Sequence, residues 1–262
     1  MTTTDEILAL ATSAAGPRSA AAASAGTEAI DSAVGVTEAD LVAFGEAAAR
    51  GAGSAVVRAL LAVRPAAAPW APPPAAPPGD PAWNAWLTAA AATAAADDAT
   101  RTPENSDATR TPEDKETAGP IHPAWFAVFA AGTALADPPA GIPAGMTVPA
   151  AIAAGMSAAT VVESGLADWG AWSSGTVGAA IGASVTAGLL LGLTQPQLRS
   201  ALGICATQAA GLVAAEATPA FALQVGKAAF NGVEAALLAR SGLTAPDDPL
   251  DGRRGLFALF SS

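Results

Sequence analysis

The run from Trp172 to Leu198 limits the possible folds of this chain more than any other stretch, because none of its residues is charged. Its central part, GTVGAAIGASVTAGLLLGL, is long enough to cross a bilayer. However, Gly, Ala, Ser and Thr fill much of the run, no basic cluster flanks it, and it leads into the polar residues TQPQ. We therefore expect a helix buried inside a helical protein and no membrane span.

The rest of the chain carries the same helical signal. Hydrophobic residues make up 52% of the 262 residues, but only 5% are aromatic and Tyr is absent. Alanine favours helix, and no strand-like alternation persists over five residues. We expect an all-α fold, with one compact domain over residues 1–262 and Thr37 as an N-cap with Asp40 in the first turn. The expected helices are 2–16, 38–63, 82–98, 122–136, 148–167, 175–193, 194–213 and 226–243.

Two stretches interrupt the helical pattern. Residues 64–81, RPAAAPWAPPPAAPPGDP, form a proline-dense connector that fits neither a helix nor a sheet interior. Within residues 98–118 the heptapeptide DATRTPE occurs at 98–104 and again at 107–113. A polar repeat with proline has no large apolar side chain to bury, so we expect a mobile surface insertion. A regulatory role and a slippage-generated insertion are both open explanations of the repeat.

Charge and cysteine content argue against several classes of protein. The formal net charge is −11, and the clustered Lys and Arg that nucleic-acid phosphates require are absent. The single cysteine, Cys205, excludes an internal disulfide and fits a reducing compartment. Its apolar neighbours predict a packed thiol, with a reactive thiol as the alternative. The N-terminal MTTTDEILALATSA is acidic where a signal peptide is basic, so we expect no export signal and a cytoplasmic protein.

The second half of the chain contains two long motifs: residues 173–212, beginning SSGTVGAAIGASV, and residues 226–257, beginning GKAAFNGVEAALL. They resemble the glycine- and alanine-rich helix pair and the lysine-containing signature of the MmgE/PrpD family. IHPAWFAVFAAGTALA resembles its His-Pro helix and WNAWLTAAAATAAADD the acidic helix before it. The resemblance covers about residues 40–257 and is most specific after residue 170. The family includes 2-methylcitrate dehydratase, cis-aconitate decarboxylase and iminodisuccinate epimerase.

This resemblance implies an all-helical first domain that carries most of the active site and uses no cofactor. In the family a smaller α/β lid domain follows. The sequence stops at Ser262, about where that lid would begin, so we expect either no lid or a lid supplied by a separate chain. Since the family tends to dimerise and exposed apolar surface needs cover, we expect a homodimer or a complex with a lid-bearing partner.

Lys227 is surrounded by small and apolar residues at the expected start of the helix 226–243. It falls on the family's active-site lysine, so the resemblance implies that it binds the substrate's carboxylate. A partly desolvated ammonium holds an anion strongly, and the same desolvation lowers the pKa of the lysine. The alternative is a surface lysine whose stem lies on the helix while its amine reaches water.

His122 and two aspartates are the candidate proton-transfer groups. His122, the single histidine, falls on the active-site histidine of the family's His-Pro motif, and its ordinary pKa suits acid–base work near neutrality. Asp97 and Asp98 resemble the family's acidic cluster, although Ala95 and Ala99 replace its leading acid and its threonine. The repeat separates these aspartates from His122 by more residues than is usual in the family. A surface histidine and a solvated helix end are the alternatives.

Two positions depart from the family pattern. Trp172 stands where a catalytic histidine is expected, and Phe230 replaces the histidine three residues after the lysine. Both exchanges remove a titratable hydrogen-bonding ring and add stacking surface for a larger, apolar substrate. Helix capping or helix–helix hydrogen bonding explains the remaining polar candidates as well as substrate binding does. These candidates are Ser173, Ser174, Thr176, Thr207 and Gln208.

Three hypotheses for the function follow. No metal-ligand spacing, phosphate-binding glycine loop or nucleophile elbow occurs, so we expect no metal. The first hypothesis is a cofactor-free lyase of altered substrate range that removes water or CO2 from a small carboxylated metabolite. The second is an isomerase or cyclase of secondary metabolism that binds a larger apolar substrate beside Trp172 and Phe230. The third is a non-catalytic subunit that stabilises a lid-bearing or catalytic partner.

Overall fold

The computed structural model describes residues 1–15, 35–64, 70–73, 79–100, 122–138, 141–166 and 170–260. Within these ranges the regular structure is helical, and its β-interaction is one isolated bridge between Trp172 and Leu212. The expected all-α class is therefore confirmed. The α-helices are α1 (Thr3–Ala15), α2 (Glu38–Gly51), α3 (Ala55–Val63), α4 (Pro81–Thr100), α6 (Pro123–Ala134), α7 (Val148–Ser164), α8 (Ser174–Leu190), α9 (Gln195–Ala206) and α10 (Ala220–Arg240).

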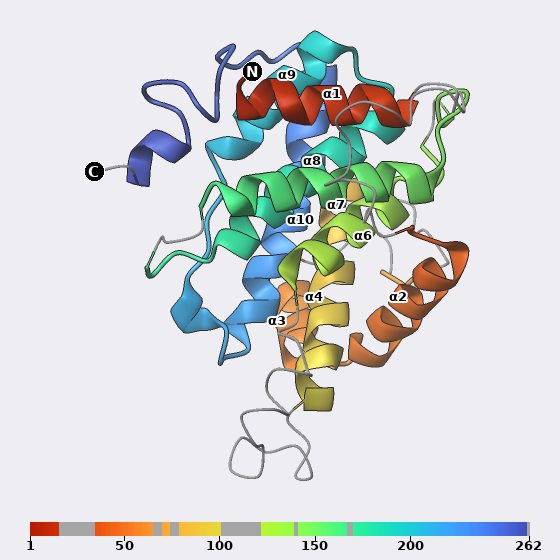
Figure 1. Cartoon of the computed structure of the whole chain (residues 1–262). Coiled ribbons are helices and arrows are strands. Elements are labelled where there is room, and N and C mark those ends of the chain that lie inside the picture. The colour runs from red at the N-terminus through yellow and green to blue at the C-terminus, as the bar shows by residue number, and fades with distance from the viewer. Residues whose placement is uncertain are drawn as a thin grey trace.

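The uncharged run forms α8, which lies at the centre of the fold. Every residue from Thr176 to Leu190 is buried. Helices α6, α7, α9 and α10 pack around it (Figure 1). Small residues allow this close packing: a Cβ added at Gly182 of α8 would lie 2.5 Å from the carbonyl oxygen of Gly155 in α7. In the part of the chain that the structure describes, no helix is long and apolar enough to cross a membrane.

The remaining helices cover the two ends of this core. Helix α1 lies over α7 and α9, whereas α2 and α3 pack against α4 (Figure 1). An ion pair of 2.9 Å between Asp5 and Arg199 holds α1 against α9. The Thr3 hydroxyl also donates to Asp251 at 2.7 Å, which ties α1 to the C-terminal segment.

One predicted helix, 38–63, is wrong because the chain forms two helices there. Its predicted start is confirmed: the Thr37 hydroxyl accepts from the Asp40 N–H at 3.3 Å. Helix α2 ends at Gly51, which lies so close to the main chain of Ala91 in α4 that an added Cβ would overlap the Ala91 carbonyl oxygen. Ser54 then caps α3.

The last two predicted helices have different boundaries in the structure. The helix predicted at 194–213 ends at Ala206, because the following chain turns back to pair with the segment before α8. The Val213 N–H donates to the Ala171 carbonyl at 3.0 Å in this pairing. Helix α10 begins at Ala220, six residues before its predicted start. Lys227 therefore lies in the third turn, so the prediction that it begins a helix is wrong.

The two interruptions are described only in part. Helix α4 continues to Thr100, so the first residues of the predicted insertion 98–118 are helical, and residues 101–118 lie outside the described residues. The connector 64–81 is described at 64, 70–73 and 79–81, where Pro81 already begins α4, a position that proline favours.

Candidate active site

His122 immediately precedes α6. Pro123 is the first helical residue, and its missing N–H is not needed at that position. The imidazole Nε2 lies 2.9 Å from Oε2 of Glu163, in the last turn of α7. The His122 side chain is 43% exposed, so the ring is held at one edge and open to solvent at another. The structure thus pairs His122 with an acid that sequence reasoning missed.

Glu163 is held in a confined position beside α8. Its side chain is only 18% exposed, and its second oxygen, Oε1, is buried with no hydrogen-bond partner in the described residues. A Cβ added at Gly178 of α8 would lie 2.6 Å from its Cγ, so glycine makes room for this side chain. The available sequence signal was that Glu163 is the one charged residue between positions 148 and 166.

The carboxylate of Glu163 changes the proton affinity of His122. Its hydrogen bond raises the pKa of His122 above the ordinary 6.5, partial burial of the ring opposes this, and the negative charge of Glu163 adds to the rise. A histidine with a raised pKa keeps its proton to higher pH than an ordinary histidine does. This pair is therefore suited to general acid–base chemistry.

An aromatic-walled hollow of about 290 Å³ adjoins His122. It lies between α2 and α6, with Trp125 stacked on Phe129 at a centroid distance of 5.0 Å and Phe44 beside Phe129 at 5.5 Å. Apart from His122, Asp40 is the polar residue of its described lining. The hollow suits the apolar body of a small molecule more than a densely charged one.

A second polar group lies at the start of α8. The hydroxyls of Ser173 and Thr176 are 3.0 Å apart, and both residues are buried. Ser173 also donates to Glu216 at 3.3 Å, and the amide of Gln224 in α10 donates to Thr176 at 3.2 Å. We call Ser173, Thr176, Glu216 and Gln224 the hydroxyl cluster. Sequence reasoning identified its two hydroxyl residues but missed Glu216 and Gln224.

The His122–Glu163 pair and the hydroxyl cluster flank the same end of α8. The Pro123 ring lies against Gly175, since a Cβ there would be 3.3 Å from it, and Glu163 lies against Gly178 one turn further along. Thr176 lies between these glycines in sequence and contacts α10 through Gln224. The first two turns of α8 thus separate an acid–base pair from a set of hydrogen-bonding groups.

Lys227 lies three residues after Gln224 on α10, but its described contacts are different. Its Nζ lies 3.8 Å from the ring centroid of Phe230 and 4.9 Å from that of Trp86 in α4. Burial lowers the pKa of Lys227, the charge of Glu234 opposes this, and the charge of Arg64, the residue after α3, lowers the pKa further. The expected desolvated ammonium is present, but its described contacts are aromatic rings. A carboxylate-binding role for Lys227 stays a prediction.

Two aspartates and a tryptophan are further predicted site residues. Asp97 is half-buried and Asp98 is exposed in the last turns of α4. The described acid that pairs with His122 is Glu163 and not either of these aspartates. Trp172 is 39% exposed at its bridge to Leu212. Their participation in chemistry stays a prediction.

Three further polar candidates lie around the loop after α9 and the start of α8. Ser174 is the half-buried first residue of α8. The exposed Thr207 donates to the Ile204 carbonyl at 2.7 Å, and the Gln208 carbonyl accepts from Asn231 at 2.9 Å. Thr207 thus makes a local contact, and Gln208 is bound through its main chain, so the substrate-binding roles of both side chains stay predictions.

Cys205 is a packed core residue, as predicted. It is fully buried, its thiol lies 3.2 Å from the Ala180 carbonyl, and burial raises its pKa to about 12. The described residues also contain no group of three or more His, Cys, Asp or Glu side chains that could hold a metal ion.

Together these features define a helical protein with an acid–base pair and buried hydroxyls at the start of a central, glycine-rich helix. The chain belongs to the MmgE/PrpD family: the sequence model of the MmgE/PrpD N-terminal domain matches residues 87–262, about two thirds of the chain. A search of curated proteins found no match. Helices α1, α2 and α3 precede the matched region, so the α2 wall of the aromatic hollow lies outside it.

Proposed function

We propose that this protein is an acid–base enzyme, in its simplest form a lyase that removes water or CO2 from a carboxylated small metabolite with an apolar body. The observation that carries the proposal is the 2.9 Å contact between His122 Nε2 and Glu163 Oε2. Lyases of this kind need a group that takes or gives a proton beside the bond that breaks. Membership of the MmgE/PrpD family supports this class of reaction.

In this proposal His122 exchanges the proton through Nδ1. Because Nε2 donates to Glu163, Nδ1 is the nitrogen that accepts a proton from substrate when the ring is neutral. Glu163 then stabilises the imidazolium that forms, and the same imidazolium returns the proton to a leaving hydroxyl or to a carbanion. Glu163 acts through His122 and is therefore a positioning residue.

The first turn of α8 supplies a place for the substrate's carboxylate. The N–H groups at the start of a helix lack partners within the helix and favour anions. Ser174 begins this helix, 17 residues long, and Gly175 there lies against Pro123, next to His122. Lys227 is a second anion-binding candidate, implied by the resemblance.

A larger, apolar substrate is the second candidate, and the aromatic hollow favours it. Phe44, Trp125 and Phe129 place three rings on the side of His122 where a substrate's body would lie. An isomerase or cyclase uses the same proton transfer without loss of water or CO2. In that case His122 stays essential while the products differ.

We also propose that a second chain covers the surface near the hydroxyl cluster. Trp172 is 39% exposed, and Leu212, its bridge partner, is 52% exposed, so two large apolar side chains lie side by side on the surface. A homodimer or a lid-bearing partner would bury them. Trp172→Ser should shift the protein from dimer to monomer in size-exclusion chromatography with light scattering; a monomeric wild type, tested alone and with candidate partners, contradicts this proposal.

The test of the function uses purified protein with cis-aconitate, 2-methylcitrate and hydroxy acids that carry larger apolar bodies, with products followed by NMR. His122→Gln should lower turnover at least about 100-fold, the usual contribution of a general acid–base group. Thr160→Ala is the matched control, because its exposed hydroxyl donates only to the α7 backbone at Met156. Isomerised products would select the second candidate.

Two results would overturn the proposal. The first is full turnover in His122→Gln, which would exclude the histidine from the chemistry. The second is the absence of turnover with every substrate class and partner tested, which would favour the non-catalytic subunit.

A further inference from the structure

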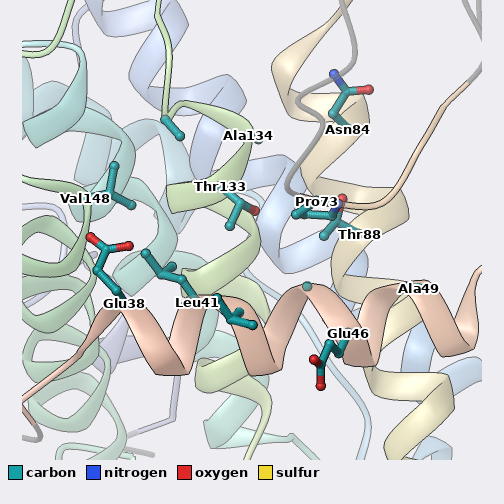
Figure 2. Close-up of a pocket in the computed structure, with 13 residues that line it drawn as sticks. Glu38, Leu41, Glu46, Ala49, Pro73, Asn84, Thr88, Thr133, Ala134 and Val148 are labelled. Atoms are coloured by element: carbon teal, nitrogen blue, oxygen red, sulfur yellow. The ribbon is translucent and has the colours of Figure 1, made fainter.

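A second cavity, of about 450 Å³, lies on the other side of α2 from the hollow at His122. Helices α2, α4 and α6 surround it, and Figure 2 shows Thr133 and Thr88 on facing helices beside the side chains of α2. No residue of its described lining also lines the His122 hollow. Its described lining is Glu38, Leu41, Val42, Gly45, Glu46, Ala49, Pro73, Asn84, Thr88, Thr133, Ala134, Ala136 and Val148.

The size and the walls of this cavity are those of a small-molecule site. Its volume falls within the range of about 300–1,000 Å³ in which proteins bind small ligands. On one side, α2 presents Leu41, Gly45 and Ala49 at four-residue spacing, which places them on one face of the helix. Pro73 lies against Gly45, because a Cβ added to Gly45 would lie 3.2 Å from the Pro73 carbonyl oxygen. Most of the wall is therefore apolar.

Two hydroxyls provide polar contacts within this apolar wall. Thr88 is only 4% exposed, it lines the cavity, and its hydroxyl has no hydrogen-bond partner in the described residues. The Thr88 oxygen is not among the fully buried polar atoms that lack a partner in the described residues, so it keeps accessible surface in the cavity and can bond a molecule there. Thr133 uses its hydrogen on the Ala130 carbonyl at 3.2 Å, so its oxygen still accepts. A ligand oxygen between these helices could accept from the Thr88 hydroxyl, and a ligand O–H group could also donate to the Thr133 oxygen.

The charges of the cavity select against anions. Glu38 and Glu46 of α2 belong to the described lining, and that lining holds no Lys, Arg or His. A carboxylate placed here would be repelled and would lose its hydration without a cation to replace it. This is the opposite of what a carboxylated substrate requires.

We propose that this cavity is a binding site for an uncharged, apolar small molecule that carries one hydroxyl or carbonyl group, separate from the site at His122. Thr88 bonds the ligand's oxygen, and the apolar faces of α2 and α6 cover its body. Since α2 precedes the region that the family model matches, this site is built partly from residues outside the family's N-terminal domain model.

The experiment titrates the full chain with cyclohexanol and with cyclohexanecarboxylate at pH 7, and follows the methyl NMR signals of Thr133 and Val148. Cyclohexanol should shift both signals saturably, with cyclohexanecarboxylate at least about tenfold weaker. Thr88→Val should weaken cyclohexanol binding about fivefold, the effect of one hydrogen bond, without a change in fold. Ala49→Trp, at an exposed position of α2, should fill the cavity and abolish the shifts.

A control variant distinguishes binding in this cavity from binding in the hollow at His122. His122→Gln should leave the cyclohexanol affinity unchanged, whatever its effect on catalysis. Absence of cyclohexanol binding, equal binding of the carboxylate, or binding that survives Ala49→Trp would each overturn the proposal. So would a loss of affinity in His122→Gln, because it would place the probe in the other hollow.

Discussion

The contact between α7 and α8 offers the sharpest test of how this fold is held together, through the substitution Gly182→Ala. A Cβ at Gly182 would lie 2.5 Å from the carbonyl oxygen of Gly155, 2.9 Å from a Val128 methyl and 3.1 Å from Ala159 Cβ. The first neighbour is backbone and cannot rotate away as a side chain can. To restore normal contact, α7 and α8 must separate by roughly an ångström, which weakens dispersion contacts along the interface.

Two opposing terms set the expected magnitude for Gly182→Ala. Alanine in a helix interior is favoured over glycine by about 1 kcal/mol. Overpacking a well-packed core costs about 1–3 kcal/mol, and clashes with backbone belong at or above the upper end of that range. The free energy of unfolding should therefore fall by about 2 kcal/mol, which lowers Tm by about 6 °C in a chain of this size.

The assay is urea and thermal unfolding of the full chain, followed by far-UV circular dichroism. Gly53→Ala is the matched control, because an added Cβ there meets nothing within 4 Å. That variant should be unchanged or more stable by up to about 1 kcal/mol. If Gly182→Ala proved as stable as Gly53→Ala, the close approach of the two backbones would not be what requires glycine.

Three further outcomes follow from the described contacts. Thr88→Val should leave the free energy of unfolding within about 0.5 kcal/mol of wild type in urea titrations, because its hydroxyl opens to the cavity and makes no hydrogen bond within the described residues; a larger loss of stability would mean that the hydroxyl is satisfied. Cys205, with a pKa of about 12, should not react with a thiol reagent at pH 8 until the protein unfolds, and rapid labelling of the native protein would contradict its burial. Glu163→Gln should lower the pKa of His122 measured by NMR. Because the pKa of His122 is raised in the folded state, the His122–Glu163 pair contributes its full stability below the unfolded pKa of about 6.5 and loses it as pH rises through the folded pKa. A stability advantage of wild type over Glu163→Gln that grows with pH would contradict a raised pKa for His122.

Much of the helical architecture could be predicted from local patterns. The uncharged run from Trp172 to Leu198 required burial of nearly a whole helix, and α8 is buried from Thr176 to Leu190. Local capping was also readable, as at Thr37. Boundaries failed where tertiary contacts decide them: the break after Gly51 follows its approach to α4, and the early end of α9 follows the pairing of Ala171 with Val213.

The candidate site was only half predictable for the same reason. His122 was identifiable from its type and motif, but its partner Glu163 lies 41 positions further along the chain and meets it only because the start of α6 and the end of α7 both lie beside α8. Gln224 and Lys227 are three residues apart on α10, yet their contacts differ, with Thr176 in one case and with two aromatic rings in the other.

The amino-acid sequence by itself determined that this protein is all-α and that its central helix is made of small, uncharged residues. These are properties of local propensity and of hydrophobic burial, which each segment carries alone. Only the tertiary structure decided which acid pairs with His122, which side of α10 reaches α8, and that α2 has a cavity on each side. Such contacts depend on helix crossing distances, and those distances are set by glycines whose neighbours come from other parts of the chain.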